Sequence, residues 1–289
     1  SLNNIPQTDF MQLLTTFIES KEGLTMIIAQ AQTSNGWQNK YFVIDTGATI
    51  SLFSPEVCKV ENTCDSITDL NGNILISQRC SAALSLAEKS MRVEGHVVDY
   101  DTLPKIDGKQ MSGLLGVDFF TKNHIILDFD KEGMYLNGAL KVERHKLPFV
   151  PMRLGLKGFL VPTISLNCNN RELSFIVDTG ATSNLIAPTI SDSGKGIKDV
   201  ETYIVKSLAY NYLAKECELQ VQIRMSYAGR FVKHEFLEVF TIIEQDSVFS
   251  KSSILNVAHG LIGNDFIHRN KWILDFTEGK IFRKSERVC

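Results

Sequence analysis

The sequence predicts a mainly β protein made of two similar halves in tandem. The first observation is a repeated stretch, Asp-Thr-Gly-Ala-Thr, at 45–49 and again at 178–182, each copy following three apolar residues. The second is a pair of downstream motifs, Gly-Leu-Leu-Gly at 113–116 and Gly-Leu-Ile-Gly at 260–263. The same order in both halves indicates an internal duplication, and two copies are too few for a solenoid.

Length and composition limit the class of protein. A chain of 289 residues is long enough for one large domain or for two of about 140 residues. Its 44% hydrophobic and 22% charged residues are ordinary for a globular protein, and a net charge of −3 gives no electrostatic argument for a nucleic-acid or anionic-membrane partner. No apolar run approaches the ~18 residues that a membrane-spanning helix needs.

The six cysteines divide three and three between the halves and show no zinc-binding spacing. Cys58 with Cys64, and Cys168 with Cys217, could form disulfides, and free thiols are an equal alternative. The start at Ser1, without an initiator methionine, is typical of a trimmed product. Together with the even cysteine count, it slightly favours an exported protein, periplasmic or extracellular, over a cytoplasmic one.

The N-terminal segment, residues 1–23, reads as a helical lead-in. Its apolar residues recur at helical spacing: Phe10, Leu13, Leu14, Phe17 and Ile18. We expect a helix over 6–20, capped by Thr8 or Asp9, that packs one face on the body. A partner-binding helix is the alternative.

After this segment the pattern changes to that of strands. Runs at 24–32 and 40–44 flank Asn35-Gly36, a hairpin signal, and runs at 159–167 and 171–177 flank Asn169-Asn170. Each Asp-Thr-Gly therefore ends the second strand of a hairpin. Prolines and glycines between 144 and 158 mark the boundary, so we expect a first half over 24–147 and a second over 148–289.

A second hairpin follows in each half. In the first half its polar tip is Asn71-Gly72, and the equivalent zone of the second half, 204–216, contains Tyr210 and Tyr212 but no glycine. Further strands are expected at 82–87 and 93–98 in the first half and at 219–225 and 236–243 in the second.

Two like units in one chain usually pack about a pseudo-two-fold axis, which would bring Asp45 and Asp178 together. Two carboxylates about 3 Å apart cannot both ionise, so they share a proton. One can then activate a water while the other protonates or polarises a carbonyl group.

The residues beside each aspartate fit this chemistry. Gly47 and Gly180 allow a tight turn and supply N–H donors to the carboxylates. Thr46 and Thr179 can form hydrogen bonds across the axis. A second pair of threonines is expected to reach the outer carboxylate oxygens: Thr49 and Thr182. The downstream Leu-Leu-Gly and Leu-Ile-Gly motifs would form an apolar bed behind the turns.

These motifs resemble those of the aspartic peptidases, the standard example of such a dyad, and in particular the retropepsin-like group with its Asp-Thr-Gly-Ala turn. The resemblance covers ~24–137 and ~159–283. It implies two pseudo-symmetric acid-protease β-barrel halves with few short helices, hairpin flaps over a peptide-binding cleft, and hydrolysis without metal or cofactor. A pepsin flap sequence with its tyrosine is lacking, so Asn71 and Gly72 are candidates for the first flap and Tyr210 or Tyr212 for the second.

The resemblance implies an aspartic endopeptidase that acts on a peptide or protein substrate, with Asp45 and Asp178 as catalytic residues. A monomer containing an intrachain pseudo-dimer is expected. The alternatives are a catalytically silent peptide- or protein-binding module on the same fold and an enzyme that processes a single partner protein. The remaining repeated acids are interpreted as structural: Asp118, Asp128, Asp265 and Asp275. No metalloprotease or serine-hydrolase motif is present.

Overall fold

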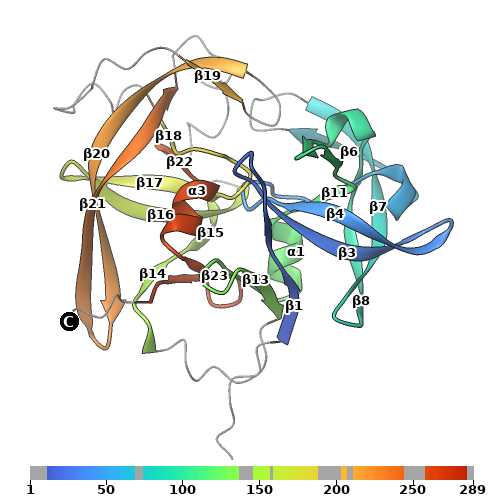
Figure 1. Ribbon diagram of the computed structural model, residues 1–289, viewed down its shortest axis with the longest axis horizontal. Coiled ribbons are helices and arrows are strands. Elements are labelled where there is room, and N and C mark those ends of the chain that lie inside the picture. The colour runs from blue at the N-terminus through green and yellow to red at the C-terminus, as the bar shows by residue number, and fades with distance from the viewer. Residues whose placement is uncertain are drawn as a thin grey trace, which may run out of the picture.

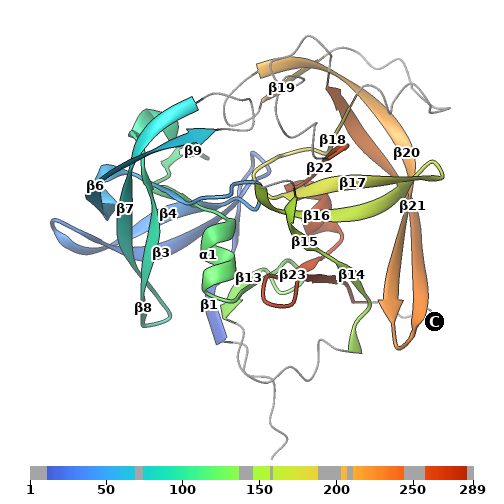
Figure 2. The ribbon, with the colours of Figure 1, turned by 180° about the vertical axis from the view of Figure 1, so that it is seen from behind.

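The computed structural model describes residues 12–68, 74–136, 146–156, 159–187, 203–206, 211–243 and 258–284. They form a mainly β protein with two barrel-like lobes, the first half of the chain in one lobe and the second half in the other (Figures 1 and 2). The expected fold class is confirmed. No helix among these residues is long and apolar enough to cross a membrane.

The N-terminal helix expected over 6–20 is wrong for residues 12–19, which form two strands, β1 (Gln12–Thr16) and β2 (Ile18–Glu19). β1 pairs with the edge of β13 (Gly133–Leu136), with a register shift between Leu13 and Thr15. The bulge lets Leu14 and Phe17 both face the core at helix-like spacing, so a strand can satisfy the same apolar pattern. The helix-cap candidates and Phe10 lie outside the described residues.

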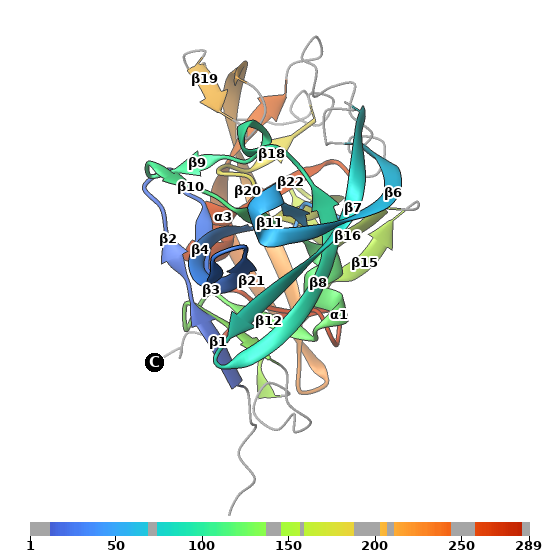
Figure 3. The same ribbon diagram turned by 90° about the vertical axis from the view of Figure 1, so that its right-hand side faces the viewer.

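The first half follows the expected strand pattern. Its main sheet has the order β2-β3-β4-β11-β5-β8-β7-β6. In Figure 3, where this half faces the viewer, β6, β7 and β8 run across the front. Its elements are β3 (Thr25–Thr33), β4 (Gly36–Ile44), β5 (Leu52–Phe53), η1 (Pro55–Val57), β6 (Cys58–Thr68), β7 (Ile74–Leu86), β8 (Lys89–Val97), η2 (Tyr100–Thr102), β9 (Lys105–Ile106), β10 (Lys109–Gln110), β11 (Gly113–Leu115), α1 (Val117–Lys122), β12 (Ile125–Asp128) and β13.

The second half repeats this plan, with a longer hairpin in the place of β7–β8. Asn169 and Asn170, both at positive φ, form the expected tight turn between β16 and β17. Its elements are β14 (Phe149–Pro151), β15 (Arg153–Leu156), β16 (Phe159–Cys168), β17 (Arg171–Asp178), β18 (Leu185–Ile186), β19 (Tyr203–Lys206), β20 (Asn211–Tyr227), β21 (Arg230–Ile243), β22 (Gly260–Gly263), α3 (Asn264–Arg269), β23 (Ile273–Asp275) and β24 (Lys280–Phe282).

A shared sheet joins the halves. β12 of the first half pairs with β23 of the second, and Leu127 lies opposite Leu274. Both strands carry Ile-Leu-Asp, so the same sequence lies antiparallel to itself. A pseudo-two-fold axis therefore passes between the two leucines. β1 extends this shared sheet and β2 extends the sheet of the first half, so the lead-in is integrated into both. The exact division at 147/148 remains a prediction.

Candidate active site

The two Asp-Thr-Gly turns leave equivalent strands of the two halves. Asp45 follows β4, whose last three residues are fully buried, and its N–H donates to Leu115 O at 3.0 Å. Asp178 ends β17, in register with Gly263 of β22. In each half the strand before the aspartate runs parallel to the strand of the downstream glycine motif. The apolar residues of both glycine motifs are buried there, so the apolar bed expected behind the turns is present.

Two threonines connect the turns across the axis. The Thr46 N–H donates to Thr179 Oγ1 and the Thr179 N–H donates to Thr46 Oγ1, each at 3.0 Å. The hydroxyl of Thr46 donates to Val177 O at 2.6 Å, and that of Thr179 donates to Ile44 O at 2.8 Å. Both threonines are completely buried. The four hydrogen bonds form a reciprocal set in which each turn satisfies polar groups of the other.

The glycines bring the two carboxyl groups together. The N–H of Gly47 donates to Asp45 Oδ1 at 3.0 Å, and that of Gly180 donates to Asp178 Oδ1 at 2.9 Å. A Cβ added at Gly47 would lie 2.3 Å from Asp178 Cγ, and one added at Gly180 would lie 2.5 Å from Asp45 Cγ. Each carboxyl group therefore occupies the space that a side chain on the opposite turn would fill, and any other residue would separate the pair.

Burial and mutual repulsion set the charge of the pair. Asp45 is 8% exposed and Asp178 is 2% exposed. Burial raises the pKa of Asp45 well above its usual range, and the charge of Asp178 and a hydrogen bond between the two carboxyl groups raise it further. Burial also raises the pKa of Asp178, whereas hydrogen bonds from Asp45 and the turn N–H groups act to lower that pKa. The two carboxyl groups therefore titrate as a pair, and burial with mutual repulsion favours the state in which they share one proton.

The second pair of threonines does not make the expected contact. Thr49 and Thr182 are half-buried, and within the described part of the chain neither hydroxyl forms a hydrogen bond with Asp45 or Asp178. Thr182 instead packs near Gly23, where an added Cβ would lie 3.8 Å from its methyl group. Their role in holding the carboxylates remains a prediction.

The two candidate flap hairpins are present as strand pairs. β6 pairs with β7, and β19 pairs with β20; in Figure 1 β19 lies at the top of the molecule and β6 at its upper right. Asn71, Gly72 and Tyr210 lie outside the described residues. Tyr212 lies in β20, opposite Val205 of β19. The assignment of flap residues therefore stays a prediction.

The support behind the first turn was missed in the sequence. Ser51, six residues after Asp45, donates its hydroxyl to Asp118 Oδ1 at 2.7 Å and its N–H to Asp118 Oδ2 at 3.0 Å. The Ser51 hydroxyl also accepts the N–H of Gly116 at 3.0 Å. Asp118 thus ties the chain after the turn to the start of α1, which fits its interpretation as structural.

The second half supports its turn with different residues. Asn184, also six residues after its aspartate, accepts the N–H of Gly263 at 2.9 Å and donates to the buried Glu238 at 3.1 Å. Arg269 neutralises Glu238 at 2.6 Å and also pairs with Asp265 at 2.8 Å. The sequence could have shown that Ser51 and Asn184 are equivalent, because each lies six residues after its aspartate. It could not have indicated Glu238, which lies outside every repeated motif.

The other repeated acids close turns, as expected for structural residues. Asp128 Oδ1 accepts the N–H groups of Asp130 and Lys131 at 2.9 and 2.8 Å. Asp275 Oδ1 accepts those of Thr277 and Glu278 at 2.9 and 3.0 Å. The described residues contain no cluster of three or more His, Cys, Asp or Glu side chains suited to a metal ion.

The cysteines of the described part are free thiols: Cys58, Cys64, Cys80, Cys168 and Cys217. Of the two alternatives left open by the sequence, the structure has the free-thiol form for both candidate pairs. Burial raises the pKa of Cys168 to about 12 and that of Cys217 to about 11, so these two are core residues and not reactive thiols.

Comparison with known proteins identifies the fold. No protein-family model matches the sequence, and no significantly similar sequence is found among curated proteins. The fold matches 279 chains of solved structures, among them basic 7S globulin from soybean, with a TM-score of 0.60 and 11% sequence identity over 96% of this chain and 98% of that chain. At this identity the match shows the fold alone. The chain therefore has a two-lobed, pepsin-like fold over nearly its whole length.

Proposed function

We propose that the chain is an aspartic endopeptidase of the retropepsin-like kind, with both units fused in one chain. The observation that carries the proposal is the pair of Asp-Thr-Gly turns, held together by reciprocal threonine hydrogen bonds with both carboxyl groups buried against each other. A structural role alone does not require two acids to be buried at one point, because an unpaired buried carboxylate is costly. Two buried carboxyl groups with perturbed pKa values at one point are typical of a catalytic site.

With one proton on the two carboxyl groups, the protonated one can act as an acid and the ionised one as a base at the same place. In the proposed reaction the Asp178 carboxylate takes a proton from a water molecule as that water attacks the substrate carbonyl carbon, and protonated Asp45 donates its proton to the carbonyl oxygen. A tetrahedral diol forms. Its collapse breaks the C–N bond, Asp178 gives its proton to the leaving nitrogen, and Asp45 recovers a proton from a hydroxyl of the diol. The dyad is regenerated without a cofactor.

The proposed substrate is a peptide or protein chain, and one copy of this protein contains the complete dyad. No second chain is then needed for the chemistry, in contrast to retropepsins that assemble from two short units. An exported location remains a prediction from the sequence.

A silent binding module on the same fold is the second candidate. It is favoured by one observation, the match to a solved structure whose name is that of a globulin and not of a peptidase. In a module that only binds, Asp45 and Asp178 are under no chemical constraint to share a proton, so their replacement would leave binding intact.

The experiment is hydrolysis of a mixed peptide library between about pH 3 and about pH 7, with and without a pepstatin-type inhibitor. We expect cleavage that the inhibitor blocks, and complete loss of cleavage in Asp45→Asn and in Asp178→Asn with the fold retained. Full activity in either single variant would exclude the dyad. Peptide binding without cleavage by the wild-type chain would favour the binding module.

A further inference from the structure

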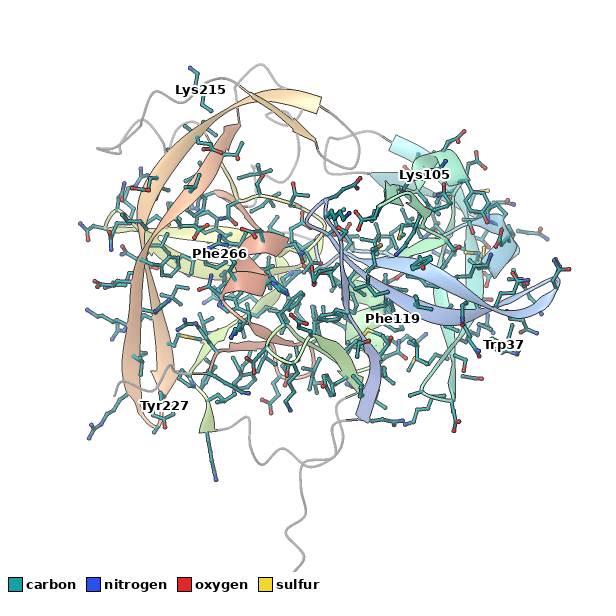
Figure 4. The ribbon with its side chains drawn as sticks, in the orientation of Figure 1. Trp37, Lys105, Phe119, Lys215, Tyr227 and Phe266 are labelled. Carbon is teal, nitrogen blue, oxygen red and sulfur yellow. The ribbon has the colours of Figure 1, made fainter. Side chains whose placement is uncertain are left out.

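The long hairpin β20–β21 has an open outer edge. β21 pairs with β20 along its whole length, but on its other edge it pairs with β18 only at Thr241 and Ile242. Among the described residues no strand lies against that edge between Arg230 and Glu238. The end of this hairpin, marked by Tyr227, extends to the outer side of the molecule, away from the centre where the two halves meet (Figure 4). The edge is therefore placed where another chain can approach it.

The side chains along this edge are unusually apolar for exposed positions. Phe231 and Leu237 are each 59% exposed, and Val239 is 45% exposed. Lys233 and Glu235 lie between them, also exposed, on the same face of the strand because side chains alternate. Natural sheets usually protect open edges with charges or short strands, because unpaired backbone groups otherwise recruit another strand.

The equivalent edge in the first half provides an internal comparison. β8 follows β7 as β21 follows β20, and it pairs with β5 as β21 pairs with β18. Its exposed residues are polar: Lys89, Ser90, Arg92 and Glu94. The charges have partners within the chain, Arg92 with Glu61 at 3.8 Å and Glu94 with Lys122 at 3.9 Å. The same position in the duplicated fold is thus a polar edge in one half and an edge of mixed apolar and charged side chains in the other.

The charges on the second edge lack this internal neutralisation. Lys233 lies directly opposite Arg224 in the hairpin, and like charges at opposite positions are destabilising. Within the described part of the chain neither side chain forms an ion pair, and the Arg224 guanidinium stacks 3.7 Å from the ring centre of Phe231. A carboxylate supplied from outside would relieve this repulsion.

A second copy of the chain can supply that carboxylate. A two-fold axis perpendicular to the sheet at His234 places Lys233 of each copy opposite Glu235 of the other, and Phe231 opposite Leu237. An axis at residue 233 or 235 would instead place Lys233 or Glu235 opposite itself. We propose that two copies associate edge to edge through β21, antiparallel about His234, forming one continuous sheet across a self-complementary contact.

The association is independent of the proposed function. The monomer expected from the sequence rested on the pairing of Asp45 with Asp178 within one chain, and that pairing is unchanged in each copy of the dimer. The proposed dimer contact lies on the outer side of the second half.

The test is sedimentation equilibrium of the full chain over a range of concentrations. We expect wild type to shift from monomer to dimer mass. Lys233→Glu places two glutamate pairs across the contact and should weaken association about tenfold. This variant should fold normally, because a glutamate at 233 would lie opposite Arg224. The matched control, Arg92→Glu on β8, should associate like wild type.

The double variant Lys233→Glu with Glu235→Lys restores opposite charges across the axis and should recover the dimer. A wild-type chain that stays monomeric at every concentration would overturn the proposal. So would association that Lys233→Glu leaves unchanged, or a double variant that associates as weakly as the single one.

Discussion

The reciprocal threonine contact gives a prediction that requires no substrate. Replacing Thr46 with valine keeps nearly the same volume and removes one hydroxyl. That hydroxyl donates to Val177 O and accepts the N–H of Thr179, and both partners belong to the opposite turn. Thr46 is fully buried, so water cannot replace it. Each orphaned buried group costs about 1–3 kcal/mol, so the free energy of unfolding should fall by about 2–6 kcal/mol.

The measurement is denaturant unfolding followed by fluorescence, with Thr46→Ser as the matched control. Serine retains the hydroxyl and loses only a methyl group, so it should stay within about 1.5 kcal/mol of wild type. Because the contact is reciprocal, Thr179→Val should cost about as much as Thr46→Val. If Thr46→Val were as stable as Thr46→Ser, the four hydrogen bonds would not be what holds the turns together.

Two further predictions concern the carboxyl groups. Gly47→Ala puts a methyl group 2.3 Å from Asp178 Cγ, which must move by about 1 Å, so we expect about 10²-fold lower peptidase activity. Gly36→Ala has open space around it but a φ of +88°, so this control should lower the stability of its own turn and keep the activity. Asp45→Asn should stabilise the fold at neutral pH. Because the pKa of Asp45 is raised in the folded state, the folded protein holds a proton there that the unfolded chain has released. The free energy of unfolding of the wild type therefore falls as the pH rises, and the asparagine variant avoids this loss. The gain should vanish below about pH 3.9, where both states are protonated, and a pH-independent gain would contradict the assignment.

The sequence was sufficient for features set by local signals. Asn169-Asn170 can adopt positive φ, so the turn between β16 and β17 could be placed to the residue. The repeated Asp-Thr-Gly turns, followed by the same glycine motifs, were sufficient to pair Asp45 with Asp178, because two like units pack about an axis. In these cases the interactions that determine the local structure involve residues within or next to the motif itself.

Features set by distant partners were not predictable. Residues 12–16 are a strand because the edge of β13, more than a hundred residues later, is there to pair with them. Glu238 supports the second turn only because β21 brings it beside Asn184. Asn264 connects the lobes by accepting a hydrogen bond from Thr25 at 3.0 Å. None of these positions carries a local pattern that distinguishes it from an ordinary surface or core residue.

The two halves agree at the pseudo-two-fold axis and differ away from it. At the axis every bond is made twice, Thr46 to Thr179 and Leu127 opposite Leu274, so a change on one side removes a contact from both. Behind the turns each half packs against itself, so a serine–aspartate pair could be exchanged for an asparagine, glutamate and arginine network without disturbing the other half. The outer edges of β8 and β21 differ as well: the exposed side chains are polar on β8, whereas β21 combines apolar and charged ones.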